Sequence, residues 1–360
     1  MKKFAFFLPQ FHSIPENDEW WGKGFTEWTN VKKGTPFFKG HNQPVVPLGK
    51  NYYNLLNKDT VVWQNQLMHE YGIDGMIYYH YYFNGRLLLE KPCENLLKWK
   101  DINQPFFFCW ANHTWNRSWE GKRTVLIEQT YGEKDDWEKH FKYLLEFFKD
   151  NRYEKYDNKP LFMLFQCEFA EKEEMMKYFD ERCKQEGFNG LYLIETFVGR
   201  INWPQDLEQM KDSISSITSK VFLREPSVCL NIYKSKFRYY PVRAINKINR
   251  KVHSIFGKSI PVIYDGNLFY DLILNEEPWD DFYIHGAFFA WDNTPRHKER
   301  GYIINPPQED KFKKLLAYAK SEECDYIFIN AWNEWAEGMM LEPTENNGYK
   351  YLEWIKNSIE

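Results

Sequence analysis

The sequence predicts an α/β protein built as a closed (β/α)8 barrel, and three observations lead to that fold. Short apolar runs of β type alternate with longer helix-like stretches along all 360 residues. Several of these runs are uninterrupted hydrophobic segments, as expected when both faces of a parallel strand are buried. No Gly-rich phosphate-binding turn follows an early strand, which disfavours the alternative of an open doubly wound sheet. We expect a single domain over residues 1–360.

The elements follow from the apolar runs and their punctuation. The eight predicted strands are Lys3–Leu8, Gly75–Tyr82, Pro105–Trp110, Pro160–Phe165, Leu191–Thr196, Ile260–Tyr264, Gly286–Trp291 and Asp325–Asn330. The predicted helices are Asp59–Tyr71 with Asp59 as N-cap, Leu87–Trp99 interrupted by Pro92, Asp135–Lys149, Glu171–Glu186, Pro307–Lys320 and Tyr349–Ser358. Phe-rich runs such as Phe106–Phe108 are expected to fill the barrel.

Two stretches are predicted to elaborate the barrel. The first strand-to-helix loop is long, punctuated by Gly, Pro and Asn, and extends to about Tyr53. The second elaboration, from Asp206 to Gly257, reads as helical and irregular pieces and is rich in basic residues.

The composition is typical of a folded protein with an aromatic core. Trp, Tyr and Phe number 15, 24 and 29 and make up 19% of the chain, beside 27% charged residues, which excludes disordered and collagen-like classes.

The longest apolar runs are far shorter than the roughly 20 residues that span a bilayer. The run Phe4–Leu8 is too short for a signal peptide, and six cysteines without a Cys-x-x-Cys pair indicate free thiols. We therefore expect a cytoplasmic protein, with peripheral contact to the inner membrane left open.

The charge is unevenly distributed. The net charge of −4 argues against a nucleic-acid partner, because neutralising phosphates needs clustered Lys and Arg. Between Lys220 and Lys258, however, ten Lys or Arg accompany one acid, Glu225. Two interpretations stay open for residues 220–258: a solvated helix face, or a patch for an anionic membrane surface or a phosphorylated carrier.

Aromatic and polar residues gather after five of the predicted strands. Active sites of (β/α)8 barrels form at the carboxyl ends of the strands. Aromatic faces pack on the C–H faces of sugar rings, and Asn, Asp, Glu, Arg and His bind hydroxyl groups, so these residues indicate a carbohydrate site. The candidate substrate-binding residues are Gln10, His12, Glu27, Trp28, Tyr79, His80, Trp110, Asn112, Trp115, Arg117, Trp291, Asp292, Asn293, Arg296, Trp332, Asn333 and Trp335.

Glu334 and Glu337 are the candidate catalytic residues. If the last strand passes into a helical turn, carboxylates at this i, i+3 spacing share a face, with Cβ atoms about 5–6 Å apart. Cleavage of a glycosidic bond needs one protonated carboxyl group as donor and one ionised carboxylate as base or nucleophile, and a short separation favours retention. The alternative that stays open is a pair of surface glutamates at a helix N-terminus.

The remaining candidates predict no cofactor. His80, His113 and His285 fall near strand ends and could converge on a metal, but no His-x-His or His-Glu-x-x-His motif is present, so no metal is expected. Arg117 and Arg296 stand among aromatic residues and could hold a ligand carboxylate or phosphate, or pair with a neighbouring acid.

Several motifs resemble a known family. They are Phe7-Leu-Pro-Gln-Phe-His12, Asn17-Asp-Glu-Trp-Trp-Gly22, Gly24-Phe-Thr-Glu-Trp-Thr-Asn30, Phe83-Asn-Gly85, Leu88-Leu-Glu-Lys-Pro92, Cys109-Trp-Ala-Asn112, Trp291-Asp-Asn-Thr294 and Asn330-Ala-Trp-Asn-Glu-Trp-Ala-Glu-Gly338. They look like the WbsX-type proteins of bacterial surface-polysaccharide gene clusters. That family is labelled as glycosyltransferase or lipopolysaccharide biosynthesis protein and is similar to glycoside hydrolase family 99, the endo-α-mannosidases and mannanases with a (β/α)8 barrel.

The resemblance implies a mechanism for the acid pair. In those hydrolases Glu-Trp-His-Glu-Gly carries both catalytic carboxylates, and a sugar 2-hydroxyl attacks its own anomeric carbon to give an anhydro intermediate. Carried over, Glu334 would deprotonate the 2-hydroxyl and Glu337 would protonate the leaving oxygen. Ala336 stands where the hydrolases have His and Met339 where they have Thr, so mannose specificity is not implied.

The sequence therefore predicts a carbohydrate-active enzyme that cleaves or transfers a glycosidic bond of a glycan or glycolipid in surface-polysaccharide metabolism. Two alternatives are a nucleotide-sugar glycosyltransferase of lipopolysaccharide, O-antigen or capsule biosynthesis, and a non-catalytic glycan-binding assembly protein.

Overall fold

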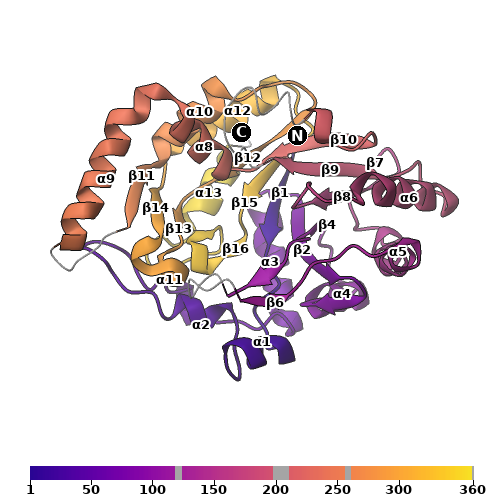
Figure 1. The fold of residues 1–360 in the computed structure, drawn as a ribbon. Coiled ribbons are helices and arrows are strands. Elements are labelled where there is room, and N and C mark those ends of the chain that lie inside the picture. The colour runs from indigo at the N-terminus through magenta and orange to yellow at the C-terminus, as the bar shows by residue number, and fades with distance from the viewer. Residues whose placement is uncertain (118–123, 198–210, 256–260, 359–360) are drawn as a thin grey trace.

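A closed barrel of eight parallel strands forms the centre of the molecule (Figure 1). The computed structural model describes residues 1–117, 124–197, 211–255 and 261–358. The barrel strands are β1 (Lys2–Phe7), β2 (Gly75–Phe83), β4 (Phe106–Trp110), β8 (Lys159–Leu164), β9 (Tyr192–Phe197), β10 (Thr218–Leu223), β12 (Tyr283–Phe288) and β15 (Tyr326–Asn330). They pair in chain order, and β15 pairs with β1, which closes the barrel. The predicted fold class is confirmed.

Helices surround the barrel, with α4, α5 and α6 following one another along one side (Figure 1). The helices with described bounds are α1 (Pro15–Trp21), α2 (Glu27–Val31), α3 (Lys58–Glu70), α4 (Lys91–Lys98), α5 (Lys134–Phe148), α6 (Lys172–Gln185), α8 (Ser227–Ser235), α9 (Tyr240–Ile255), α10 (Gly266–Glu276), α11 (Thr294–His297), α12 (Glu309–Ser321) and α13 (Lys350–Lys356). None of them is long and apolar enough to cross a membrane.

Smaller elements decorate the barrel ends. Four short 3₁₀ helices are described: η1 (Leu48–Lys50), η3 (Phe237–Tyr239), η4 (Lys298–Arg300) and η5 (Trp335–Glu337). The additional strands are β3 (Arg86–Leu88), β5 (Trp115–Asn116), β6 (Val125–Ile127), β7 (Lys155–Tyr156), β11 (Val262–Asp265), β13 (Trp291–Asp292), β14 (Tyr302–Asn305), β16 (Asn333–Glu334) and β17 (Met339–Met340).

The predicted helices match the observed ones with two local corrections. The stretch predicted as one helix from Leu87 begins as strand β3, which forms a hairpin with β2, and the helix itself starts at Lys91. The cap of α3 is Asn57, whose side chain accepts a hydrogen bond from the Asp59 backbone N–H; Asp59 is not the cap.

The barrel interior is filled by alternate residues of its strands rather than by whole Phe runs. Side chains of a strand alternate between its two faces, so of Phe106–Phe108 only Phe107 points inward, where its ring lies 5.3 Å from Phe4 and 5.6 Å from Phe328. Phe108 packs outward on Phe147 of α5, at 4.8 Å between ring centroids. The prediction that the whole run fills the barrel is therefore wrong.

The sixth barrel strand is β10, and the prediction of Ile260–Tyr264 for that position is wrong. Residues 262–265 do form a strand, β11, but it pairs with β14 in a three-stranded sheet outside the barrel, and Ile260 lies outside the described residues. Only the second half of β10, Val221 to Leu223, is apolar and fully buried, whereas the first half is polar and half-buried. A strand with so short an apolar run gives a weak sequence signal.

With β10 as the sixth strand, the described basic residues from Lys220 onward lie in different parts of the molecule and do not form one surface. Lys220 lies on β10 and donates to the backbone carbonyl of Asp281, while Arg224 follows the strand into the mouth of the barrel. The predicted elaboration from Asp206 therefore includes a barrel strand, and its first residues, 206–210, lie outside the described residues, as does Lys258.

The assignment of β10 predicts a large stability difference between two strands. Phe222 is fully buried, with its ring 5.5 Å from Phe6 and 5.3 Å from Phe328, so Phe222→Ala should lower the free energy of unfolding by about 3–5 kcal/mol. Ile263→Ala on β11, a half-buried position, should cost about 1 kcal/mol. Urea unfolding followed by circular dichroism measures both, and equal losses would contradict the placement of β10 in the barrel.

Candidate active site

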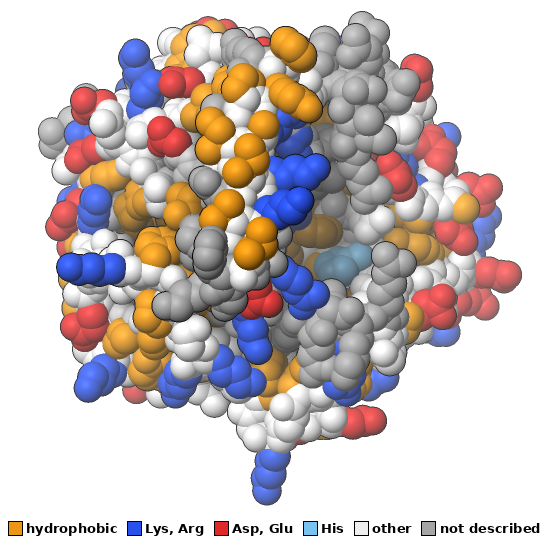
Figure 2. All heavy atoms as spheres, turned by 60° about the vertical axis from the view of Figure 1, so that its left-hand side comes forward, with side chains coloured by type: hydrophobic (Ala, Val, Ile, Leu, Met, Phe, Trp, Pro, Cys, Tyr) orange, Lys and Arg blue, Asp and Glu red, His pale blue; other side chains and the backbone are white. Residues whose placement is uncertain are grey.

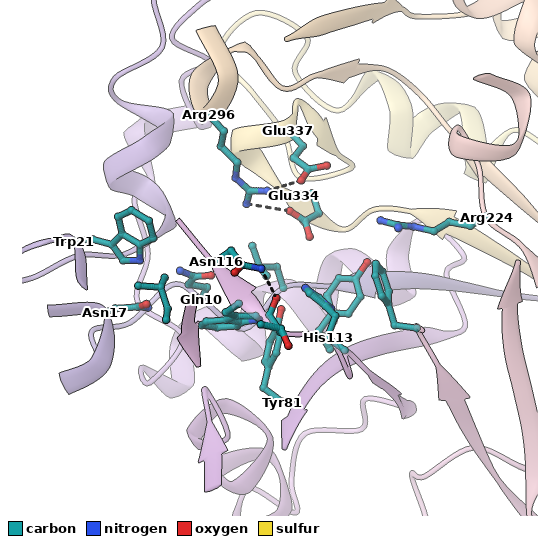
Figure 3. A pocket seen from close by; sticks show the side chains of 17 residues that line it. Gln10, Asn17, Trp21, Tyr81, His113, Asn116, Arg224, Arg296, Glu334 and Glu337 are labelled. Carbon is teal, nitrogen blue, oxygen red and sulfur yellow. Dashed lines mark hydrogen bonds and ion pairs between the residues drawn. The ribbon is translucent and has the colours of Figure 1, made fainter. Parts of the chain in front are cut away.

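A cavity of about 430 Å³ opens at the carboxyl ends of the barrel strands (Figure 3). Six residues predicted from the sequence line it: Gln10, Tyr79, Trp115, Arg296, Glu334 and Glu337. The other lining residues are Leu8, Asn17, Trp21, Tyr81, Ala111, His113, Thr114, Asn116, Leu126, Phe165 and Arg224. The cavity therefore combines aromatic walls with amide, imidazole, guanidinium and carboxyl groups.

The two candidate catalytic glutamates come from one tight turn after β15. Glu334 ends β16, and Glu337 ends the single 3₁₀ turn η5, which takes the place of the helical turn expected from the sequence. Gly338 then adopts φ +63°, and a Cβ there would lie only 2.9 Å from Asp292 atoms, so the turn requires glycine. This turn places both carboxyl groups at the same cavity wall.

The guanidinium of Arg296 contacts three carboxylates. Its Nη2 lies 2.5 Å from Oε1 of Glu27 and 3.6 Å from Oε2 of Glu334, and its Nη1 pairs with Oε1 of Glu337. The Glu27 side chain is fully buried and that of Arg296 is 9% exposed. Burial alone would lower the pKa of Arg296, but the three glutamates raise it, so this guanidinium stays charged.

The two glutamates have different environments. Burial, and then the neighbouring Glu337 carboxylate, raise the pKa of Glu334 to about 8, although Arg296 and Arg224 act in the opposite direction. The Oε2 atom of Glu334 is buried and has no hydrogen-bond partner among the described residues. Glu337 is more exposed, 23% against 11% for the Glu334 side chain, and forms the short ion pair with Arg296. At neutral pH the Glu334 carboxyl group is therefore mainly protonated.

A buried carboxylate that the sequence analysis missed, Glu342, fixes this turn from behind. It accepts hydrogen bonds from the indole N–H groups of Trp332 and Trp335, at 2.9 and 2.6 Å, and from Tyr53 Oη and Gln64 Nε2, at 2.7 and 2.6 Å. Burial raises its pKa to about 7. The available signal was a glutamate inside the otherwise apolar run that follows Gly338.

Three tryptophans predicted to bind substrate belong to this support and do not line the cavity. Trp332 and Trp335 are fully buried and donate to Glu342. Trp28 donates its indole N–H to the backbone carbonyl of Tyr53 and packs on Trp335, with ring centroids 5.2 Å apart. These three rings therefore lie in the interior, outside the cavity lining.

Strand alternation explains why two further predicted residues lie outside the cavity. On β2, Tyr79 and Tyr81 face the cavity, so His80 between them faces α5, where its ring is 2.9 Å from that of His140 and burial lowers its pKa to about 3. On β4, Trp110 likewise faces outward and donates to the Tyr82 carbonyl. The prediction placed both residues at the substrate because it considered how near they are to the strand end and not on which face of the strand their side chains lie.

Asn112, Asn333 and His12 lie behind the cavity wall. Asn112 exchanges two hydrogen bonds of 2.7 Å with the backbone of Gln166, joining the loops after β4 and β8. Asn333 does the same with the backbone of Leu8. His12 is buried, which lowers its pKa to about 4 and keeps its ring neutral. Asn112 and Asn333 therefore hold loops in place, whereas neither ring nitrogen of His12 has a hydrogen-bond partner among the described residues.

The segment around α11 positions Arg296. Asp292 accepts hydrogen bonds from Gln43 Nε2 at 2.6 Å and the Thr294 hydroxyl at 2.6 Å, and it is 2.8 Å from the His41 ring. The Asn293 side chain accepts from the Tyr302 backbone N–H, and Trp291 packs against the Tyr302 ring. Of these predicted residues, Trp291, Asp292 and Asn293 are not cavity-lining. Arg117, also outside the lining, lies over the Trp21 ring at 5.3 Å.

Arg224 is the most consequential residue that the sequence analysis missed. It follows β10, and because that strand was not recognised, its end was not searched. The guanidinium lies over the Phe165 ring at 4.4 Å and faces the cavity, with Glu334 between it and Arg296 in Figure 3. Burial, and then the charge of Arg224, lower the pKa of His113 to about 4, so this neighbouring ring is neutral.

The three histidines considered as metal ligands do not converge. His113 lines the cavity, His80 contacts His140, and His285 lies 3.0 Å from Glu277 with its ring stacked on Trp279. Among the described residues, one group has ligand atoms within 4.8 Å of one another: Glu225, Cys229 and Glu277, all buried behind Arg224 and outside the cavity. Burial, and then Glu277, raise the pKa of Glu225.

Comparison with solved structures supports the fold. The GH99 endo-alpha-mannosidase of Bacteroides thetaiotaomicron has 10% sequence identity and a TM-score of 0.56, over 99% of this chain and 96% of that one. A protein described as glycoside hydrolase-like has 13% identity and a TM-score of 0.58, over 100% of this chain and 94% of that one. At such identities the likeness establishes the barrel fold alone.

Comparison with curated sequences and family models shows to which protein family the chain is related. Two curated proteins of Xanthomonas campestris pv. campestris, each described as uncharacterized protein WxcX, are 30% and 31% identical over 99% of this chain. The chain spans about half the length of these relatives, 49% in each case. The model of the family described as Glycosyltransferase WbsX matches residues 3–355. Since this match extends over nearly the whole sequence, the chain belongs to the WbsX glycosyltransferase family.

Proposed function

We propose that the protein cleaves or transfers a glycosidic bond in bacterial surface-polysaccharide metabolism, with retention of anomeric configuration and with Glu334 and Glu337 as the working pair. Family membership and the glycoside-hydrolase-like fold support a carbohydrate-active enzyme. The observation that carries the finer proposal is the acid pair at the cavity wall, which contacts one guanidinium and in which burial raises the pKa of Glu334 to about 8.

A pair of glutamates in which one carboxyl group is protonated fits the acid–base chemistry of glycosidic bond cleavage. Bond cleavage needs one carboxyl group that gives a proton to the leaving oxygen and one carboxylate that accepts a proton from the attacking hydroxyl. Burial favours the protonated form of Glu334, and the guanidinium of Arg296 pairs with Glu337. We therefore assign the donor role to Glu334 and the base role to Glu337, the reverse of the roles that the family resemblance implies.

The reaction steps balance with these roles. Glu334 protonates the leaving oxygen as its bond to the anomeric carbon breaks, while Glu337 takes the proton of the hydroxyl that bonds to that carbon. When the attacking group is the sugar's own 2-hydroxyl, the product is an anhydro sugar. Water or a second sugar hydroxyl then attacks the anomeric carbon and gives its proton to Glu334. Glu337 returns its proton to the 2-oxygen as the anhydro ring opens, which restores the resting pair. Hydrolysis and transfer differ only in this acceptor.

The cavity walls suit a sugar chain. Tyr79, Tyr81 and Trp115 supply aromatic faces on which C–H faces of sugar rings pack. Gln10 and Asn17 lie across the cavity from Arg224 (Figure 3) and present amide groups that bind hydroxyls in defined directions. The acid pair lies between these two ends, so a glycan of at least two sugar units would have its bond beside Glu334.

The direct test is turnover of the glycan made by the protein's own gene cluster. Incubation in ¹⁸O-labelled water followed by mass spectrometry distinguishes hydrolysis, which adds labelled oxygen to the new reducing end, from transfer, which lengthens an acceptor without label. We expect one of these products, with retained configuration by NMR. Product of inverted configuration, or none from any fraction of that glycan, would contradict the proposal.

The second candidate is a glycosyltransferase that uses a nucleotide-sugar donor, as the family description suggests. The observation that favours it is the presence of two guanidinium groups, Arg224 and Arg296, at the cavity, since Arg binds phosphate well. This enzyme would release a nucleoside diphosphate, which a coupled assay detects. We expect no release, because Arg296 is already engaged by three carboxylates.

Arg224 predicts preference for an anionic sugar. No salt bridge of Arg224 is found among the described residues, so its charge is available to a carboxylate or phosphate on the substrate. Arg224→Met should weaken binding of a uronic-acid oligosaccharide by roughly 10- to 100-fold and binding of its neutral counterpart by less than about 3-fold. Titration calorimetry measures both affinities.

The matched control is Arg300→Met, which removes the same charge from an exposed position outside the cavity lining. It should leave both affinities unchanged. Equal weakening of acidic and neutral ligands by Arg224→Met would contradict charge recognition, because it would indicate a packing role on Phe165.

A further inference from the structure

Helix α9 and the turn η3 before it expose an apolar stripe. Large hydrophobic side chains here are far more exposed than elsewhere in the described chain: Phe237 is 87% exposed, Ile255 71% and Ile248 60%. Tyr240, Ile245 and Val252 are also exposed. Such side chains normally cover a core, so a concentration of them in solvent indicates a surface that binds something.

The stripe has helical spacing. Ile245, Ile248, Val252 and Ile255 follow one another at intervals of three, four and three residues, which places them on one face of α9. Figure 2 shows apolar side chains in a row on this face of the molecule, with Lys and Arg side chains beside the row and a hollow next to them. The stripe is therefore a continuous ridge at the surface.

Basic residues flank the stripe, and acids are absent from this part of the sequence. No Asp or Glu occurs between Glu225 and Asp265. Lys247 and Lys251 are exposed, and their spacing of four residues places them one turn apart, beside the apolar face. The stripe and its lysines together form an amphipathic helix that carries cations and contains no acidic residue.

The base of this helix is fixed to the barrel. Tyr239 stacks on Tyr233 of α8 at 4.9 Å, and Lys236 forms an ion pair with Glu276 of α10 at 2.8 Å. The buried side chains of α8, Val228, Cys229 and Ile232 among them, anchor that helix. The N-terminal end of the apolar ridge is thus attached to the folded protein, and its exposed side chains lie away from the core.

We propose that this ridge docks on an anionic lipid membrane. The isoleucines would enter the boundary between headgroups and acyl chains, and Lys247 and Lys251 would lie among the phosphates. A second copy of the chain fits less well, because two such ridges in contact would bring cationic faces together without acids to pair them. This inference does not rest on the proposed function, although a membrane at this face would present lipid-linked glycans beside the hollow.

Sedimentation with lipid vesicles tests the proposal on the full chain. We expect binding to vesicles with about one third phosphatidylglycerol, little binding to pure phosphatidylcholine, and weaker binding as salt rises. Lys247→Gln with Lys251→Gln should weaken binding roughly 30-fold, since each lysine near an anionic surface contributes about a factor of five. Ile245→Ser, Ile248→Ser and Ile255→Ser together should weaken it by at least as much.

The control replaces two exposed lysines on other helices, Lys177→Gln and Lys314→Gln, and should leave vesicle binding unchanged. All variants should keep the wild-type melting temperature and turnover of a soluble glycan, because the changed residues are exposed and outside the cavity. Failure of membrane docking is thereby distinguished from failure of the proposed function. Absence of vesicle binding, equal binding to neutral vesicles, or a dimer that the isoleucine changes dissociate would overturn the proposal.

Discussion

Glu334→Gln and Glu337→Gln are each expected to lower turnover of a glycan by about 10³-fold, with glycan binding retained. Each variant removes one of the two proton transfers, and a positioned acid or base contributes about 10²–10⁴-fold. Glutamine keeps the size of the carboxyl group, so the fold should persist. Wild-type turnover in both variants would contradict the catalytic assignment and support a non-catalytic glycan-binding protein.

A substrate with a good leaving group separates the two roles. An aryl glycoside needs little protonation of its leaving oxygen, so it should restore activity to the variant that lacks the proton donor and not to the one that lacks the base. With the assignment made above, Glu334→Gln is rescued. Rescue of Glu337→Gln instead would restore the roles that the family resemblance implies.

The pH dependence follows from the pKa of Glu334, about 8. As a donor, Glu334 must be protonated, so kcat/KM should fall as pH rises through about 8. The free energy of unfolding should also fall as pH rises. Glu334 in the folded protein retains a proton that an ordinary glutamate in the unfolded chain loses above about pH 4.5, so the decrease lies between about pH 5 and 8. Glu334→Gln removes this contribution and should gain stability relative to wild type as pH rises.

Arg296→Met is expected to cost about 3–5 kcal/mol of stability at pH 8, because it leaves the buried Glu27 and its two neighbours without their cation. The loss should be smaller at pH 5, since buried carboxylates that lack a counter-ion take up protons as pH falls. Turnover should also drop, because Glu337 loses its ion pair. Urea unfolding at the two pH values measures the effect.

A double variant tests the cause of that loss. Arg296→Met with Glu27→Gln should recover part of the stability, because a neutral amide replaces the uncompensated charge, and the two changes should not be additive. Arg300→Met, which removes an exposed charge nearby, should change stability by less than about 0.5 kcal/mol. A stable Arg296→Met protein at pH 8 would contradict the view that one guanidinium neutralises the site.

The sequence predicted the barrel well because seven of its eight strands are mostly apolar and mostly buried. Strand β10 was missed because only Val221, Phe222 and Leu223 are apolar, while the separate strand that starts at Val262 gave a stronger signal. This error also affected the predicted site. Arg224 follows the missed strand, so a cavity-lining cation was counted only as part of a basic surface.

Nearness to a strand end predicted the cavity-lining residues less well than the face of the strand on which a side chain lies. Tyr79 and His80 are consecutive on β2, yet one lines the cavity and the other contacts α5. The tryptophans of the Glu334 loop were expected to bind sugar, and instead two of them donate to the buried Glu342. Which indole turns inward depends on a carboxylate acceptor that only the folded chain brings to it.

By itself, the sequence determined the alternation of strands and helices and the acid pair at i, i+3, because hydrophobic periodicity and local spacing are properties of neighbouring residues. The tertiary structure decided what depends on residues far apart in the chain. Glu27 and Arg296, 269 positions apart, meet at 2.5 Å beside Glu334 and Glu337. Burial among these groups raises the pKa of Glu334, since charge and desolvation act through space and not along the sequence.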